Sequence, residues 1–172
     1  MEGSINKTVI ARLLINSRLL FLLGLANGAP LLAKKLLGAR FSIPVDSGTT
    51  APDHQAFFGS SKTVRGILLS VFFTALGGCF LGLPFGKAAL IGTGAMAGDL
   101  FSSFCKRRLR LPASSKAIGL DQVPESLFPI LLCRKWFSLK VLDVLAIVVS
   151  FFLSELVVSK VLYRFDLRDQ PY

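Results

Sequence analysis

The sequence is poor in cysteine, and none of its cysteines belongs to a short metal-binding or redox motif. The three present, Cys79, Cys105 and Cys133, lie far apart, and no Cys-x-x-Cys pair occurs. Thiolate metal sites and disulfide frameworks normally need more numerous or more closely spaced cysteines. We therefore expect these thiols to pack in apolar surroundings, without a metal or a disulfide.

The start of the chain lacks the features of a removable signal peptide. Residues 1–16 carry charges but contain no apolar h-region that leads to a cleavage site. We therefore expect the N-terminal segment to be retained.

Charged residues are absent from one long stretch. Residues 66–86 contain none, and the chain as a whole is 52% hydrophobic. About 20 consecutive apolar residues are needed to cross the hydrocarbon core of a bilayer. These features predict one integral membrane domain over residues 1–172.

The apolar segments predict an all-α polytopic membrane protein with five transmembrane helices and two cytoplasmic loops that form a polar site. Asn27, Gly28 and Pro30 interrupt the first segment, either as a kink that faces the site or as a packing feature. The predicted loops are residues 38–65 and 106–120. The predicted helices are approximately residues 17–37, 66–83, 87–105, 121–133 and 138–163.

Basic residues outnumber acidic ones, 20 to 10, and they gather in the first and third connections between helices. Lys and Arg accumulate in the cytoplasmic loops of membrane proteins. Both loops and the C-terminus are therefore expected in the cytoplasm, with the N-terminus outside the cell membrane. Topology and contact with anionic lipids explain the net charge of +10, so nucleic acid is not an expected partner.

The end of the first loop has the composition of a phosphate-binding segment. Gly59 precedes Lys62, Thr63 and Arg65 just before the second helix. Glycine lets backbone amides approach an anion, and the three side chains can donate to phosphate oxygens. A Walker A motif is absent, because the glycine that it needs directly before the lysine is replaced by Ser61. Lys62 and Arg65 could alternatively be interfacial anchors.

Acidic and basic residues also surround the second loop. Asp99 ends an apolar run, and Asp121 and Glu125 lie four residues apart, on one face of the next helix. Intramembrane acids are costly and are candidates for function. Carboxylates around a basic cluster indicate a metal ion and phosphates at a membrane surface. Alternatively, Asp99 pairs with a neighbouring base. The cluster contains Lys106, Arg107, Arg108, Arg110 and Lys116, and Ser114 and Ser115 are further donors to phosphate or ribose.

Other features have simpler explanations. The run from Gly92 to Gly98 imitates a dinucleotide-binding fingerprint, but it lies within a predicted membrane helix. We expect its small residues to allow close helix packing. Glu155 lies deep in the fifth predicted helix, where Lys140 or Lys160 could neutralise it.

These elements together resemble the CDP-diacylglycerol synthase family. The family signature is G-D-L, then S and K-R, and later L-D-R-x-D-S. This chain departs from it at Gln122, lacks the usual His-Gly-Gly and is short, which is typical of the archaeal branch, the CDP-archaeol synthases. That branch also has an F-G-x-x-K-T-x-R-G element, matched by Phe58-Gly59-Ser60-Ser61-Lys62-Thr63-Val64-Arg65-Gly66. The signature is matched by Gly98-Asp99-Leu100, Ser103, Lys106-Arg107 and Leu120-Asp121-Gln122-Val123-Pro124-Glu125-Ser126.

The resemblance implies a cytidylyltransferase that uses CTP and Mg²⁺. The acceptor it implies is 2,3-bis-O-geranylgeranylglycerol 1-phosphate, with CDP-archaeol and pyrophosphate as products. It implies Asp99, Asp121 and Lys106 as catalytic residues and Asp99, Asp121 and Glu125 as metal ligands. The residues it implies for binding CTP or lipid phosphate are Gly59, Lys62, Thr63, Arg65, Ser103, Arg107 and Ser115. The alternative is a small transporter or a non-catalytic subunit, and the sequence does not indicate an oligomeric state.

Overall fold

The computed structural model describes residues 2–115 and 117–164, and these residues form five helices. The helices are α1 (Glu2–Leu37), α2 (Val64–Phe80), α3 (Phe85–Arg108), α4 (Gln122–Cys133) and α5 (Val141–Arg164). Strands are absent from the described residues, which contain two isolated β-bridges, Pro44 to Thr63 and Thr50 to Ala56. The prediction of an all-helical fold with five helices is confirmed.

The largest difference from the predicted boundaries lies in the first helix. α1 begins at Glu2 instead of residue 17, and it continues through Pro30 without a break. The charged residues near its start do not end it, because good helix formers such as Ala11, Arg12 and Leu13 follow. The other predicted boundaries differ from the observed ones by at most three residues.

Three of the helices are long and apolar enough to cross a membrane. These spans are residues 9–37, 85–108 and 141–161. α2 and α4 are shorter apolar helices of 17 and 12 residues. At 1.5 Å per residue, α4 is only about 18 Å long, against a hydrocarbon core of about 30 Å. Spanning by all five helices therefore remains a prediction.

α3 lies at the centre of the fold and packs against α1, α2 and α4, whereas α5 contacts α1 and α4. Its glycines permit the close approach of α4. A Cβ atom on Gly98 would lie 2.1 Å from the Pro124 carbonyl oxygen, and one on Gly94 would lie 2.7 Å from the Pro129 Cα. The prediction that this run of small residues serves close packing is confirmed.

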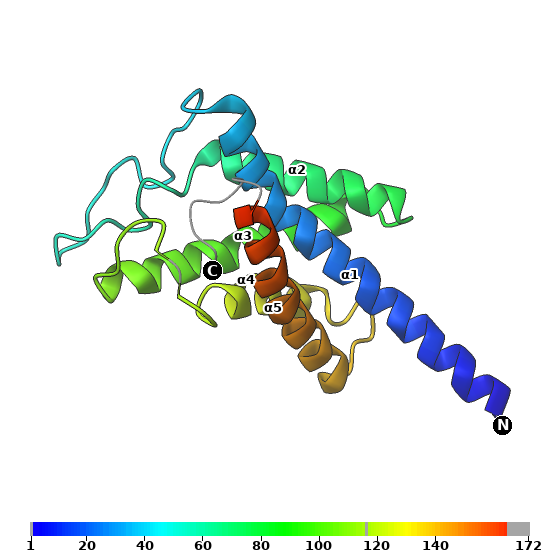
Figure 1. Ribbon diagram of the computed structural model, residues 1–172. Helices are drawn as coiled ribbons and strands as arrows, with labels where there is room; N and C mark the ends of the chain where they lie inside the picture. Colours follow the sequence, from blue (N-terminus) through cyan, green and yellow to red (C-terminus); the bar gives the residue numbers. More distant parts are fainter. Residues whose placement is uncertain (1, 116, 165–172) are drawn as a thin grey trace.

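The two long connections lie at the same end of the molecule (Figure 1). The first follows α1 and the second follows α3, while the start of α1 and the turn between α2 and α3 lie towards the opposite end. Arg108 at the end of α3 joins the two regions, because its Nη2 donates to the carbonyl oxygens of Gln55 and Ala56, at 3.2 and 2.6 Å. The fold thus brings both predicted polar loops to one site.

Candidate active site

A cavity of about 710 Å³ lies where the two connections meet the ends of the helices. Its volume is in the range of small-molecule binding sites, about 300–1,000 Å³. One part of its wall is charged and comes from the two connections, α3 and α4. Another part is apolar and includes Pro30 and Leu31 of α1, Ile67 of α2 and Leu156 of α5. The cavity therefore presents a polar region beside an apolar one.

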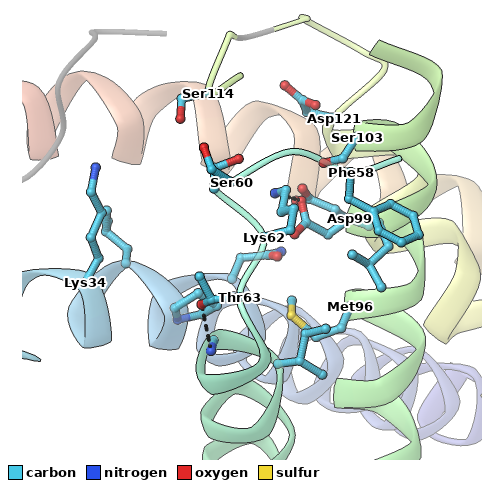
Figure 2. A pocket seen from close by; sticks show the side chains of 18 of the residues that line it. Lys34, Phe58, Ser60, Lys62, Thr63, Met96, Asp99, Ser103, Ser114 and Asp121 are labelled. Atoms are coloured by element: carbon cyan, nitrogen blue, oxygen red, sulfur yellow. Dashed lines mark hydrogen bonds and ion pairs between the residues drawn. The ribbon is translucent and has the colours of Figure 1, made fainter. Parts of the chain in front are cut away.

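Lys62 and Asp99 form an ion pair on the charged wall, with Nζ 2.5 Å from Oδ1 (Figure 2). Lys62 reaches this position because it immediately precedes Thr63, the N-cap of α2, whose Oγ1 accepts a hydrogen bond from the Gly66 amide. Burial acts to lower the pKa of Lys62, but the negative charges of Asp99, Glu125 and Asp121 outweigh it and raise the pKa. Lys62 is therefore a cation at neutral pH. The alternative pairing of Asp99 with a base that follows it in α3 is wrong.

Glu125 lies beside Asp99, within hydrogen-bonding distance of its carboxyl group, and Glu155 acts on Glu125 through its charge. The close approach of α3 and α4 at Gly98 explains this proximity, since Gly98 precedes Asp99 and contacts Pro124 and Glu125. Two carboxyl groups this close are stabilised by a nearby cation or by a shared proton, and Lys62 is a cation that acts on both of them.

Asp121 forms a second ion pair, with a lysine of α3. Its Oδ1 lies 2.6 Å from Lys106 Nζ, and the side chain of Lys106 is only 7% exposed. Within residues 2–115 and 117–164, no three Asp, Glu, His or Cys side chains lie close enough together to hold a metal ion. The structure thus brings together two of the three predicted metal ligands and places Asp121 with Lys106.

Two of the serines that were predicted to bind phosphate have hydroxyl groups that are available to a ligand. Ser103, which is 2% exposed, and Ser115 both line the cavity. The Oγ atoms of both residues are buried and have no hydrogen-bond partner among the described residues. Buried hydroxyl groups normally have a partner, so these two are suited to donate to a bound molecule.

Several predicted phosphate-binding groups are occupied by other parts of the protein. Arg107 lines the cavity, and its Nη2 donates to the Pro112 carbonyl oxygen at 2.6 Å. Arg65 also lines the cavity, and it donates to the carbonyl oxygens of Gly38 and Arg40 after α1. The Gly59 amide donates to the carboxylate of Asp46, so this amide is not directed at the cavity.

Sequence reasoning missed one residue of the cavity wall and one residue that supports the wall from outside. Lys34 lies on the cavity wall across from Asp99 (Figure 2), and its place in the last turn of a membrane helix made it look like an ordinary boundary residue. Asp46, whose side chain holds the segment before Lys62, carries no motif that could have identified it. Lys116 of the predicted basic cluster lies outside the described residues.

The chain is similar to known proteins of one family. A family model described as "CarS-like: CDP-archaeol synthase" matches residues 82–172. A CDP-archaeol synthase of Pyrococcus furiosus is 39% identical over 107 residues, which are 56% of this chain and 60% of that protein. One from Sulfurisphaera tokodaii is 33% identical over 135 residues, 75% of this chain and 81% of that protein.

The fold is also similar to a solved structure. That structure is described as an intramembrane enzyme for archaeal membrane lipids biosynthesis, and it superposes with a TM-score of 0.66 at 26% identity. The match covers 80% of this chain and 90% of the solved chain.

Proposed function

Because the chain belongs to the CDP-archaeol synthase family, we propose that its cavity transfers the cytidylyl group of CTP to an isoprenoid ether glycerol phosphate. The acceptor is 2,3-bis-O-geranylgeranylglycerol 1-phosphate, and the products are CDP-archaeol and pyrophosphate. The observation that carries this proposal is a single cavity in which a wall of cations and carboxylates adjoins an apolar wall. Such a cavity suits a triphosphate beside the headgroup of a lipid.

The chemistry requires charge compensation more than proton transfer. An oxygen of the lipid phosphate attacks the α-phosphorus of CTP and forms a new P–O bond. The bond from the α-phosphorus to the oxygen that bridges to the β-phosphate breaks, and pyrophosphate leaves with both electrons. Lys62, Lys106 and Arg107 can offset the negative charge of this reaction. The attacking phosphate is already an anion, so no general base is needed.

The donor set also fits Mg²⁺, which prefers carboxylate oxygens and keeps several waters. Asp99 and Glu125 would hold it, since their carboxyl groups are adjacent and already share the charge of Lys62. Asp121 lies near enough to act on the same lysine. Bound Mg²⁺ supplies positive charge to the phosphate oxygens. Lys62 and Lys106, which now pair with these acids, can then turn to the phosphates.

The site is proposed to face the cytoplasm, with the N-terminus outside the cell membrane. The positively charged connections at the cavity end support this orientation, and CTP is a cytoplasmic substrate. The family favours this enzyme over a non-catalytic transporter or subunit.

The test is to incubate the purified protein in detergent with CTP, Mg²⁺ and a prenylated glycerol phosphate. CDP-lipid and pyrophosphate should form in equal amounts, and chelation of Mg²⁺ should stop the reaction without unfolding the protein. Asp99→Asn and Asp121→Asn should each reduce turnover by about 100-fold or more, the usual cost of removing an essential electrostatic group.

Asp53→Asn is the matched control. Asp53 also forms an ion pair, with Arg108 at 2.6 Å, but its side chain is 41% exposed and it does not line the cavity. This variant should keep near-wild-type turnover. Absence of product with the wild type would refute the proposed function, and normal turnover in either of the other two variants would remove that residue from the site.

A further inference from the structure

Asp46 lies outside the cavity but is bonded to the segment that leads to Lys62. Its Oδ2 accepts hydrogen bonds from the amides of Phe58 and Gly59, both at 2.9 Å, and its Oδ1 accepts one from Gly48 at 3.1 Å. We propose that Asp46 is a positioning residue for the nucleotide, which holds residues 58–63 so that Lys62 reaches the triphosphate. This inference rests on the proposed function.

The backbone shows why Asp46 can act over this distance. The Val45 amide donates to the Lys62 carbonyl oxygen at 2.8 Å, and the Val64 amide donates to the Ile43 carbonyl oxygen at 2.9 Å. Residues 43–45 therefore run antiparallel beside residues 62–64, with Pro44 and Thr63 forming a β-bridge. Asp46 extends this pairing by means of its side chain.

The burial and charge of Asp46 suit this role. The residue is 9% exposed. Burial acts to raise its carboxyl pKa, but hydrogen bonds from the amides of Phe58, Gly59 and Gly48 and from its own amide outweigh burial and lower the pKa. Asp46 is therefore a carboxylate at neutral pH, and bonds from amides to an ionised acceptor are stronger than those to a neutral one.

Asp46 also determines which groups of residues 58–63 can bind a ligand. The amides of Phe58 and Gly59 are satisfied by the carboxylate, so they are not donors to a phosphate. The segment instead turns the side chain of Lys62 into the cavity, where Nζ meets Asp99. The segment thus serves to orient the side chain of Lys62, and Asp46 holds the segment in place.

The test measures CTP affinity by isothermal titration of the purified protein in detergent with Mg²⁺ present. Asp46→Asn keeps the size of the side chain but points an NH₂ group at backbone donors. The Kd for CTP should rise about 10- to 100-fold, the equivalent of losing one buried charge-assisted interaction. Asp53 lies in the same connection, but its carboxylate binds the Gln55 amide and the Arg108 guanidinium, so Asp53→Asn should change the Kd less than about twofold.

A double-mutant cycle distinguishes positioning of Lys62 from general damage to the fold. If Asp46 acts through Lys62, adding Asp46→Asn to Lys62→Gln should not weaken CTP binding beyond Lys62→Gln alone. Losses that add in the double variant would overturn the proposal, as would unchanged affinity in Asp46→Asn.

The test also covers a variant that fails to fold and a wild type that fails to bind CTP. If Asp46→Asn does not give a monodisperse protein, Asp46→Glu replaces it, because one added methylene keeps the charge but displaces the carboxylate. Its CTP affinity should fall at least about threefold, and unchanged affinity would overturn the proposal. Failure of the wild type to bind CTP would refute the proposed function itself, whereas wild-type binding with no effect at Asp46 refutes only this inference.

Discussion

The site residues differ in how deeply their charges are buried, and this determines what each ion pair contributes. The side chains of Lys106 and Asp121 are 7% and 16% exposed, whereas those of Arg108 and Asp53 are 26% and 41% exposed. Exposed pairs are typically worth about 0–1 kcal/mol. Removing one partner of a buried pair costs more, because the remaining charge is left without compensation. Loss of one partner should therefore cost more stability at the Lys106–Asp121 pair than at the Arg108–Asp53 pair.

Because Asp46 is ionised and hydrogen-bonded in the folded protein, we expect its contribution to stability to depend on pH. Its pKa is lowered from the ordinary value of 3.8, so its contribution to stability is present above that value. The contribution is lost as the pH falls through the lower pKa of the folded state. The difference in melting temperature between the wild type and Asp46→Asn should be constant from pH 7 to about 5 and shrink below pH 4. A difference that does not change with pH would contradict this assignment.

At the scale of elements, the contact between α3 and α4 sets the geometry of the acids. Gly98 lies directly before Asp99, and α4 approaches it so closely that its neighbours are backbone atoms of Pro124 and Glu125. Backbone atoms cannot move aside as a flexible side chain can. A side chain at Gly98 would therefore separate the two helices and, with them, Asp99 and Glu125.

We accordingly expect Gly98→Ala to lower both stability and turnover. Overpacking typically costs about 1–3 kcal/mol, and the displacement of Asp99 should reduce kcat more than the loss of folded protein explains. Gly86→Ala is the control on the same helix, because an added Cβ atom there meets nothing within 4 Å. Thermal unfolding and activity per folded molecule measure both effects. Equal behaviour of the two variants would show that the close contact is unimportant.

At the scale of the whole molecule, the arrangement places both long connections at one end, and their basic residues predict that this end is cytoplasmic. Single cysteines, introduced into a variant that lacks the three native cysteines, can test this predicted topology. Thr49→Cys in the first connection and Lys135→Cys after α4 are both exposed positions. A membrane-impermeant maleimide should label the first only from the cytoplasmic side and the second only from outside. Labelling of both from the same side would refute the topology.

The local sequence was sufficient to predict five helices, a membrane location and the two segments that contribute the site. These properties follow from runs of apolar residues and from the placement of charges, which depend on near neighbours in the chain. Lys62, Asp99 and Asp121 were predicted because each stands beside a glycine, a basic cluster or a break in hydropathy, whereas Ser103 was predicted from the family resemblance. The start of α1 was missed, because polar residues beyond a membrane span can still continue a helix.

Only the tertiary structure decided which charges meet. Lys62 pairs with Asp99, 37 residues away, and Glu125 joins them, while Asp121 pairs with Lys106. Asp46 acquires its role from amides 12 and 13 residues further along the chain. Such partners depend on the path of a loop and on how closely two helices can pack, and a sequence pattern does not contain these distances. The residues therefore indicated the kind of site, and the packing of α3 against its neighbours determined its arrangement.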